Sequence, residues 1–180
     1  MTFKQFALRK ELLDQIAELG YKQPTPIQEK AIPAILAGKD VLAGAQTGTG
    51  KTAAFTLPIL QLLSAKSQTK TKTPNCLILA PTRELAAQVG ESVQRYGKGL
   101  PIRSTIIFGG VNEKPQKRVL HQGVDIVIGT PGRLLDLTNQ GDLVLSSIDI
   151  VVLDEADRML DMGFIHDIRK IIQKLPRKRQ

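Results

Sequence analysis

Apolar residues occur along this chain in short unbroken runs that alternate with amphipathic stretches of helical period. Unbroken runs rich in Val, Ile and Leu are typical of strands buried on both faces, and apolar positions three and four apart are typical of helices. The runs predict strands at residues 40–43, 75–80, 104–108, 125–128 and 148–153. The amphipathic stretches predict helices at residues 11–19, 25–37, 51–65, 83–98, 112–122, 132–139 and 165–175. Strands that alternate with helices predict an α/β fold, in which a mostly parallel central sheet carries helices on both faces.

The loops after the predicted strands are the places where functional residues are expected. In open parallel sheets, ligands bind beyond the carboxyl ends of the strands. Residues 64–74, in contrast, contain Lys66, Lys70 and Lys72 among Ser, Thr and Gln without an apolar period. This composition predicts a solvated connection.

A candidate phosphate-binding loop follows the first predicted strand. Its residues are Ala45, Gln46, Thr47, Gly48, Thr49, Gly50, Lys51 and Thr52. Glycines allow the backbone to curl so that successive N–H groups point into one concavity, and the N-terminus of the following helix adds positive charge. In such a loop Lys51 reaches the β and γ phosphates, and the Thr52 hydroxyl ligates Mg²⁺. Ala45 departs from the strict pattern, which has Gly at this position.

An acidic pair after the last predicted strand supplies the second half of a nucleotide site. Asp154 and Glu155 follow an apolar strand, where a carboxylate is costly unless a cation or hydrogen bonds compensate it. Asp154 can hold the Mg²⁺ that Thr52 also serves, usually through water, and Glu155 can orient or deprotonate an attacking water. Glu155 alone would also suit a helix N-terminus. Together with the phosphate loop, the pair indicates an ATP or GTP site.

The distribution of charge makes a polyanion a candidate partner. The chain has 180 residues, with 25 Lys plus Arg and 17 Asp plus Glu, which gives a net charge of +8. Residues 61–120 carry 10 basic and 3 acidic groups, a net charge of +7, and this favours a one-sided basic surface. Net charge alone also suits a basic protein without such a partner.

Composition argues against a metal centre, an internal disulfide and a membrane span. The one cysteine, Cys76, lies in a predicted buried strand, and His121 and His166 have no Cys or His neighbours at ligand spacing. No stretch approaches the ~18 uninterrupted apolar residues that a membrane-spanning helix needs, and residues 1–10 lack the apolar core of a secretory signal. We therefore expect a cytoplasmic protein without a membrane partner.

Six short motifs, in their order along the chain, resemble those of the DEAD-box ATP-dependent RNA helicases. They are GYKQPTPIQ at residues 20–28, AQTGTGKT at 45–52, PTREL at 81–85, GG at 109–110, TPGR at 130–133 and DEAD at 154–157, the last continued by RMLDMGF. The resemblance covers essentially the whole chain, and the general character is similar to that of bacterial members. Ala45 is what this family normally has at its position.

The resemblance implies a RecA-like domain of the P-loop NTPase class. Residues 1–38 would form a helical adenine-recognition segment, the Q motif, packed on the core, and residues 39–180 would form the first ATP-binding domain. Gln28 resembles the glutamine that reads the adenine edge, because an amide offers both a donor and an acceptor. Tyr21 occupies the position of an aromatic that packs against the base, with core packing as the alternative for Tyr21 and for Phe6.

The implied site residues comprise an ATP-binding set, a catalytic set and a metal pair. The ATP-binding residues are Tyr21, Gln28, Ala45, Gln46, Thr47, Gly48, Thr49, Gly50, Lys51 and Thr52. The catalytic residues are Lys51, Asp154 and Glu155, and Thr52 and Asp154 serve Mg²⁺. Asp157 resembles the residue that couples the ATP state to RNA binding.

The resemblance also implies an RNA-binding surface. Its residues are Pro81, Thr82, Arg83, Gly109, Gly110, Thr130, Pro131, Gly132 and Arg133. All three motifs follow predicted strands, so they can converge on one edge of the sheet, where N–H groups and arginines would contact phosphates without reading bases. Contacts to the backbone and the 2′-hydroxyls make binding largely independent of sequence, with no preference for DNA. The alternative for each motif alone is a turn or a helix cap.

The family pattern continues beyond the motifs that this chain contains. A Ser-Ala-Thr motif and a second RecA-like domain, which carries arginines that complete the ATP site, are expected after residue 180. We therefore expect the first domain of an ATP-dependent RNA helicase, which binds MgATP and single-stranded RNA but needs the second domain for hydrolysis and local unwinding. The alternatives are a stand-alone nucleotide- or RNA-binding module without catalysis, and an unrelated P-loop kinase or transporter ATPase.

Overall fold

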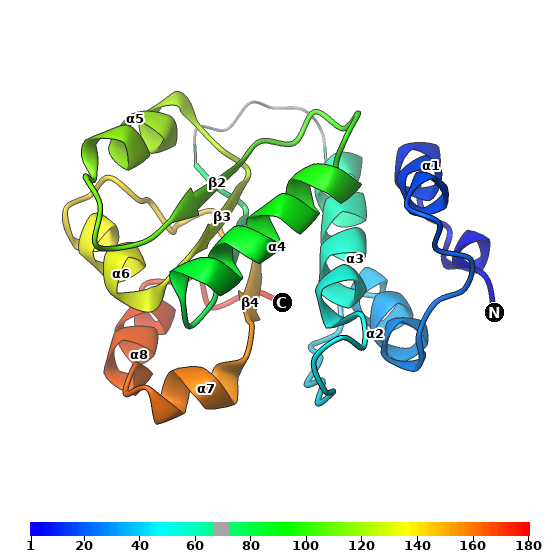
Figure 1. Cartoon of the computed structure of the whole chain (residues 1–180). Coiled ribbons are helices and arrows are strands. Elements are labelled where there is room, and N and C mark those ends of the chain that lie inside the picture. The colour runs from blue at the N-terminus through cyan, green and yellow to red at the C-terminus, as the bar shows by residue number, and fades with distance from the viewer. Residues whose placement is uncertain (67–72) are drawn as a thin grey trace. The chain divides into compact units, whose positions relative to one another are not determined.

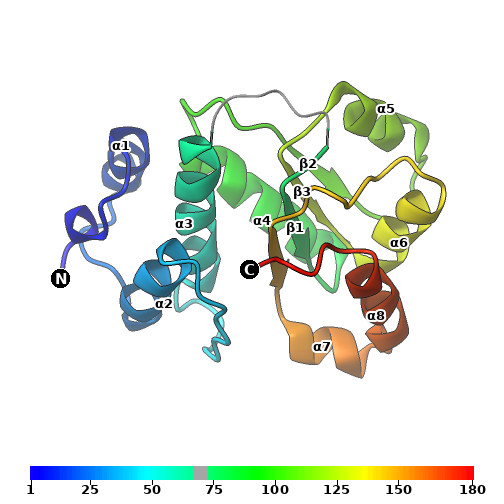
Figure 2. The same ribbon diagram turned by 180° about the vertical axis from the view of Figure 1, so that it is seen from behind.

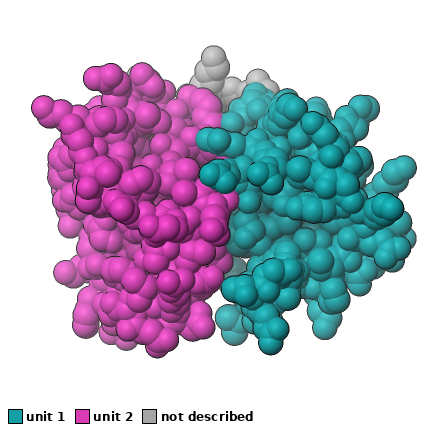
Figure 3. Space-filling view, viewed as in Figure 1, with its two compact units in different colours: residues 1–67, 91–102, 180 teal, residues 68–90, 103–179 magenta. Residues whose placement is uncertain are grey.

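The computed structural model describes residues 1–66 and 73–180, which form two compact units. Unit 1 comprises the described residues of Met1–Ser67 together with Glu91–Ile102 and Gln180, and unit 2 comprises those of Gln68–Gly90 together with Arg103–Arg179 (Figure 3). The predicted solvated connection at 64–74 falls largely at residues 67–72, outside the described residues.

The helices and strands follow one another as shown in Figure 1. Unit 1 contains the 3-10 helix η1 (Phe3–Phe6) and the helices α1 (Lys10–Glu18), α2 (Pro26–Leu36) and α3 (Lys51–Ala65). Unit 2 contains the strands β1 (Cys76–Leu79), β2 (Ser104–Ile107), β3 (Ile126–Gly129) and β4 (Ile150–Leu153). Its helices are α5 (Lys114–Gln122), α6 (Pro131–Asn139), α7 (Ala156–Asp161) and α8 (Ile165–Gln173). Helix α4 (Arg83–Tyr96) begins in unit 2 and ends in unit 1.

The sheet of unit 2 is parallel throughout, with the strand order β2-β3-β1-β4. Leu79 at the end of β1 pairs with Gly129 of β3 and with Leu153 of β4, and Gly129 also pairs with Ile107 of β2. All four strands therefore end at the same edge. The predicted parallel α/β architecture is confirmed.

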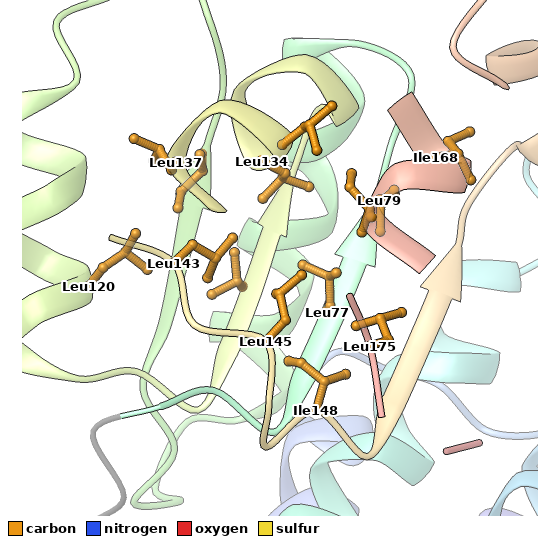
Figure 4. Packing of buried hydrophobic residues seen from close by; sticks show 14 of the residues in the cluster. Leu77, Leu79, Leu120, Leu134, Leu137, Leu143, Leu145, Ile148, Ile168 and Leu175 are labelled. Carbon is orange, nitrogen blue, oxygen red and sulfur yellow. The ribbon is translucent and has the colours of Figure 1, made fainter. Parts of the chain in front are cut away.

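Helices cover both faces of this sheet. On one face, side chains from β1 meet α6, α8 and the segment between α6 and β4, as Figure 4 shows for Leu77, Leu79, Leu134 and Ile168. On the other face, α4 approaches β2 so closely that a Cβ atom at Gly90 would overlap the Ile106 side chain. The two layers bury β1 and β3 completely, including Cys76, whereas the edge strands β2 and β4 are mostly half-buried and Leu153 is 38% exposed.

Unit 1 is built from helices (Figure 2). Helices α2 and α3 pack through Ala31, Ile35 and Ala54, whose small or branched side chains allow a close approach. Phe6 is buried and its ring meets that of Phe3 edge to face, with centroids 6.0 Å apart. Of the two alternatives for Phe6, this arrangement favours core packing.

One predicted strand is wrong. Residues 40–46 contain no strand, Val41 is 42% exposed and Leu42 is fully exposed. A four-residue strand is stable only when its peptide groups pair with a neighbouring strand. Among the described residues, the sheet pairs only β1, β2, β3 and β4, so this segment has no such neighbour. The short elements η1 and α7 were not predicted, since neither shows a full helical period.

None of the helices in the described ranges combines the length and the hydropathy that crossing a lipid bilayer requires.

Candidate nucleotide-binding loop and RNA-binding edge

The candidate phosphate-binding loop lies in unit 1, immediately before α3. Gly48 and Gly50 have φ angles of +80° and +85°, a left-handed conformation that glycine adopts without strain. The Thr49 hydroxyl donates a hydrogen bond to the Gln46 carbonyl at 2.6 Å and closes the turn. Helix α3 then begins at Lys51, so the N–H groups of its first turn have no partner within the helix. Such a turn fits an anionic group, because free N–H groups and the helix dipole favour negative charge.

The side chains of the loop differ in exposure. Gln46, Thr47 and Gly48 are exposed, whereas the two catalytic and metal candidates Lys51 and Thr52 are half-buried. The remaining predicted loop residues, which are Ala45, Thr49 and Gly50, are half-buried as well. The structure therefore brings all eight loop residues together at the start of one helix.

Gln28 fastens the start of α2 to the end of this loop. Helix α2 has Thr25 at its N-cap and Pro26 in its first turn, and the Gln28 Oε1 atom accepts a hydrogen bond from the Thr25 N–H at 3.0 Å. The Gln28 Nε2 atom donates to the Gly50 carbonyl at 3.1 Å, and the side chain is 4% exposed. A Cβ atom at Gly50 would overlap Gln28 Nε2, so only glycine fits there. Gln28 thus has a structural role between two motifs, and its reading of adenine stays a prediction.

Tyr21 lies just past the end of α1, in the same unit. Gly20, with a φ of +77°, ends the helix, and the Tyr21 N–H donates to the Ile16 carbonyl at 3.0 Å. The Tyr21 side chain is 42% exposed, and its ring contacts that of Tyr96. An exposed ring held at a fixed backbone position is free to contact a base, which leaves the predicted role open to test.

The acidic pair lies in unit 2, at the end of β4. The Asp154 N–H donates to the Leu79 carbonyl at 2.9 Å and so continues the ladder between β4 and β1 by one residue. Glu155 follows with φ 51° and ψ 51°, a left-handed conformation that is strained for any residue with a Cβ atom. The Glu155 carboxylate lies 3.4 Å from the Arg158 guanidinium. Asp157, the predicted coupling residue, is exposed in the first turn of α7.

The three predicted RNA-binding motifs meet at the carboxyl edge of the sheet in unit 2. Arg83, the first residue of α4, lies over the Phe108 ring at 5.6 Å from the ring centroid. An Arg83 nitrogen also lies 3.3 Å from the position that a Cβ atom of Gly110 would occupy. The Thr130 N–H donates to the Ile107 carbonyl at 3.1 Å, which joins the third motif to the same edge.

Arg133 is held by several acceptors beside a small groove. Its guanidinium donates to the Val111 carbonyl at 3.0 Å and to the Gln116 Oε1 atom at 3.3 Å. Gln116 in turn donates to the Phe108 carbonyl at 3.0 Å. The groove has a volume of about 360 Å³ and is lined by Gly109, Thr130, Gly132, Arg133, Asp136 and Phe164. The site residues of the second and third motifs therefore share one concave surface.

The sequence did not indicate three residues near this edge, of which Asp136 and Phe164 line the groove and Gln116 bonds to Arg133. Gln116 lies on α5 with a half-buried side chain, and Asp136 lies on α6 three residues after Arg133. Phe164 was part of the string after the acidic motif, but nothing in its local pattern assigned it to this edge. Arg133 and Asp136 are three positions apart in a predicted helix, and this i,i+3 spacing is the signal from which their contact could have been predicted.

Lys117, on α5, is a basic residue whose positive charge is compensated by neighbouring carboxylates. Its ammonium lies 2.9 Å from Glu113 and 3.2 Å from Asp142. The hydrogen bond with Glu113 raises the pKa of Lys117, and the hydrogen bond from Lys117, followed by that from Gln140, lowers the pKa of Glu113. The positive charge of Lys117 is therefore compensated by two carboxylates.

The parallel sheet, the glycine-containing loop before α3 and the acidic pair at the end of β4 define an α/β domain of the RecA-like class. The sequence model of the DEAD/DEAH box helicase family matches residues 25–180. The chain therefore belongs to the DEAD/DEAH box helicase family.

Curated relatives agree with this assignment. The DEAD-box ATP-dependent RNA helicase CshA of Streptococcus pneumoniae serotype 4 is 46% identical over 180 residues, which cover 100% of this chain and 34% of the relative. The ATP-dependent RNA helicase DeaD of Escherichia coli K12 is 47% identical, with 99% of this chain and 28% of the relative covered. The probable ATP-dependent RNA helicase DDX23 of Homo sapiens is 44% identical, with 97% and 22% covered. The chain thus spans about a third or less of the length of these relatives.

The backbone strain at Glu155 gives a first prediction. Glycine relieves a left-handed conformation and alanine does not, so Glu155→Gly is expected to be more stable than Glu155→Ala by about 1 kcal/mol. Both variants lose the contact with Arg158, which cancels in the comparison. Urea unfolding of the two variants measures the difference.

Asp157 provides the matched control for this comparison. It lies in the helical first turn of α7, where alanine is preferred, so Asp157→Ala is expected to be more stable than Asp157→Gly. Equal or greater stability of Glu155→Ala relative to Glu155→Gly would contradict the strain at position 155.

The buried amide of Gln28 gives a second prediction. A carboxylate at this position still accepts from the Thr25 N–H but faces the Gly50 carbonyl without a proton to donate. Gln28→Glu is therefore expected to lower the free energy of unfolding by about 1–3 kcal/mol near pH 7. Protonation restores the donor, so the folded protein raises the pKa of this carboxyl, and the lost stability should return as the pH falls toward ~5.

Denaturant unfolding at several pH values measures this recovery. Gln23→Glu, at an exposed position of the same unit, is the control and should show no such dependence. A pH-independent loss in Gln28→Glu would show that the hydrogen bond to Gly50 does not contribute.

Proposed function

We propose that this chain is the first RecA-like domain of an ATP-dependent RNA helicase and that it binds MgATP and the backbone of single-stranded RNA. The observation that carries the proposal is the phosphate-binding loop, which Gln28 fastens to the segment with Tyr21. The curated relatives CshA and DeaD are named as ATP-dependent RNA helicases, which supports the same activity for the whole protein.

In this proposal, one set of residues contacts the adenine base and another set binds the phosphates. Residues 1–38 contact adenine through Tyr21 and the remaining hydrogen-bonding capacity of Gln28. The backbone N–H groups of the loop and the first turn of α3 bind the phosphates, and Lys51 compensates their charge.

Magnesium is proposed to bind only together with the nucleotide. In residues 1–66 and 73–180, no cluster of three or more His, Cys, Asp and Glu side chains is suited to hold a metal ion. The Thr52 hydroxyl and the Asp154 carboxylate are hard oxygen ligands, and Mg²⁺ is usually held by one or two such groups together with substrate phosphates and water. When bound, Mg²⁺ would neutralise the charge of the phosphate oxygens.

Glu155 is proposed to act on the water that attacks the terminal phosphate. Its carboxylate would accept a hydrogen bond from this water and orient it, or take its proton. The left-handed backbone at Glu155 supports this role, because strained conformations cluster at active sites.

RNA is proposed to bind along the carboxyl edge of the sheet in unit 2. Arg83, Arg133 and the N–H groups at Gly109, Gly110 and Gly132 would contact phosphates, so that binding does not depend on base sequence. Asp157 is proposed to couple the ATP state to this surface.

Hydrolysis and local unwinding are proposed for the full-length protein only. The chain covers 34% of CshA and 28% of DeaD, so its relatives contain further sequence. A second RecA-like domain would supply arginines to the transition state, an effect worth about 10³–10⁵ in rate where arginine stabilises phosphoryl transfer.

Loss of the loop lysine tests the nucleotide site. Lys51→Ala is expected to weaken MgADP binding about 10- to 100-fold, because a charge-assisted hydrogen bond to phosphate is lost. Calorimetric titration measures the affinity, and Lys30→Ala, at an exposed position of α2, is the matched control that should bind like the unaltered chain. Unchanged MgADP affinity in Lys51→Ala would overturn the nucleotide site.

Salt dependence tests the RNA surface. Each of Arg83→Ala and Arg133→Ala is expected to weaken the binding of single-stranded RNA equally for different base sequences, and to reduce the slope of log affinity against log salt by about 0.7. Fluorescence anisotropy with two labelled RNA sequences at several salt concentrations measures both quantities. Arg169→Ala, at an exposed position of α8, is the control. A sequence-dependent loss or an unchanged slope would contradict backbone contact at these arginines.

A further inference from the structure

Tyr21 and Tyr96 contact each other within unit 1, although 75 positions separate them in the sequence. Their ring centroids lie 6.4 Å apart, the ring planes are inclined by 49°, and the two hydroxyl oxygens are 3.4 Å apart. Tyr21 is 42% exposed, whereas Tyr96 is 6% exposed. One ring is therefore anchored in the protein, and the other presents surface to solvent.

The anchored ring is fixed by its place at the end of α4. The Gly97 N–H donates to the Val93 carbonyl at 2.9 Å, and a Cβ atom at Gly97 would lie 3.3 Å from a methyl carbon of Leu60. The chain after Tyr96 thus packs directly on α3, the helix that begins with Lys51. Burial, and then the hydrogen bond with Tyr21, raise the pKa of Tyr96, so its hydroxyl keeps its proton at neutral pH.

The exposed ring depends on this partner for its orientation. Gly20 and the hydrogen bond from the Tyr21 N–H to Ile16 fix the backbone, but they leave the side-chain torsions of Tyr21 undetermined. An exposed aromatic side chain has several staggered rotamers, and a contact at its hydroxyl selects among them. The contact with Tyr96 is the hydroxyl contact that the structure shows for Tyr21.

We propose that Tyr96 is a positioning residue for adenine recognition, whose hydroxyl holds the Tyr21 ring in the orientation that packs against the base. This inference rests on the proposed function, in which Tyr21 contacts adenine. Tyr96 acts through Tyr21 and touches no nucleotide itself. Restricting the ring before binding lowers the cost of ordering it in the complex, which strengthens binding without any new contact to the ligand.

The pair also supplies its own spectroscopic probe. The chain contains two tyrosines and no tryptophan, so its intrinsic emission comes from Tyr21 and Tyr96 alone. Tyr96→Phe leaves only the emission of Tyr21, and Tyr21→Phe leaves only that of Tyr96. Phenylalanine keeps the ring and its packing and removes only the hydroxyl, so both variants preserve the buried surface.

The experiment compares a ligand with a base and a ligand without one. The 180-residue chain, both single variants and the double variant are titrated with MgADP and with magnesium pyrophosphate by calorimetry. Tyr96→Phe is expected to weaken MgADP binding about three- to tenfold and to leave pyrophosphate binding unchanged, because only base contact depends on Tyr21. Tyr21→Phe should show the same loss, and the double variant should be no weaker than either single one. In Tyr96→Phe, MgADP should still quench the Tyr21 emission.

Three outcomes would overturn the inference, and they are distinguishable. Equal MgADP affinity of Tyr96→Phe and the unaltered chain would show that the hydroxyl contact does not position Tyr21. A parallel loss of pyrophosphate affinity would make Tyr96 a general structural residue of unit 1. No MgADP binding by the folded, unaltered chain would overturn the proposed function itself, and the inference with it.

Discussion

The parallel pairing of β1 with β3 and β4 is the constraint on which the candidate site of unit 2 depends. Because Leu79 pairs with both Gly129 and Leu153, the loops that follow β1, β3 and β4 begin at the same edge of the sheet. The pairing of Ile107 with Gly129 adds the loop after β2. Motifs that are spread over more than seventy positions of sequence therefore meet at one edge, and a slip of one residue in any strand would turn its side chains to the opposite face.

In unit 1, the buried side-chain amide of Gln28, and not a sheet, holds the candidate site residues together. Gln28 accepts a hydrogen bond from the Thr25 N–H at the start of α2 and donates one to the Gly50 carbonyl in the candidate phosphate-binding loop, so one side chain joins the two segments. The same contact explains why residue 50 is glycine, because the Cβ atom of any other residue would overlap the Gln28 amide. Positive φ angles at Gly48 and Gly50 cost little, whereas the same conformation at Glu155 is strained. Among the described residues, Ala7 is the other non-glycine residue with a positive φ, at 54°, and it has no proposed chemical role.

Most helices and strands could be predicted from the sequence, because the apolar runs and the helical periods are long enough to identify them. The strands at 75–80, 104–108, 125–128 and 148–153 and the seven helices agree with the structure to within a few residues. The strand at 40–43 was wrong, because β-propensity describes a segment and not the neighbour with which it must pair. Nothing in the local sequence indicated the left-handed backbone of Glu155 or the contact between Tyr21 and Tyr96, which are 75 positions apart.

At the candidate RNA-binding edge, too, residue type alone does not determine what a side chain can do, because its neighbours differ. Lys117 and Arg83 are both basic residues near the carboxyl edge, but their partners differ. Two carboxylates compensate the charge of Lys117, whereas Arg83 lies over an aromatic ring, which orients the guanidinium and leaves its charge in place. A cation whose charge is compensated has little to offer a phosphate, so the partner of each basic residue, more than their number, decides where a polyanion can bind. The excess of basic residues at 61–120 favoured such a surface, and the contacts show that Arg83 and Lys117 would contribute to it differently.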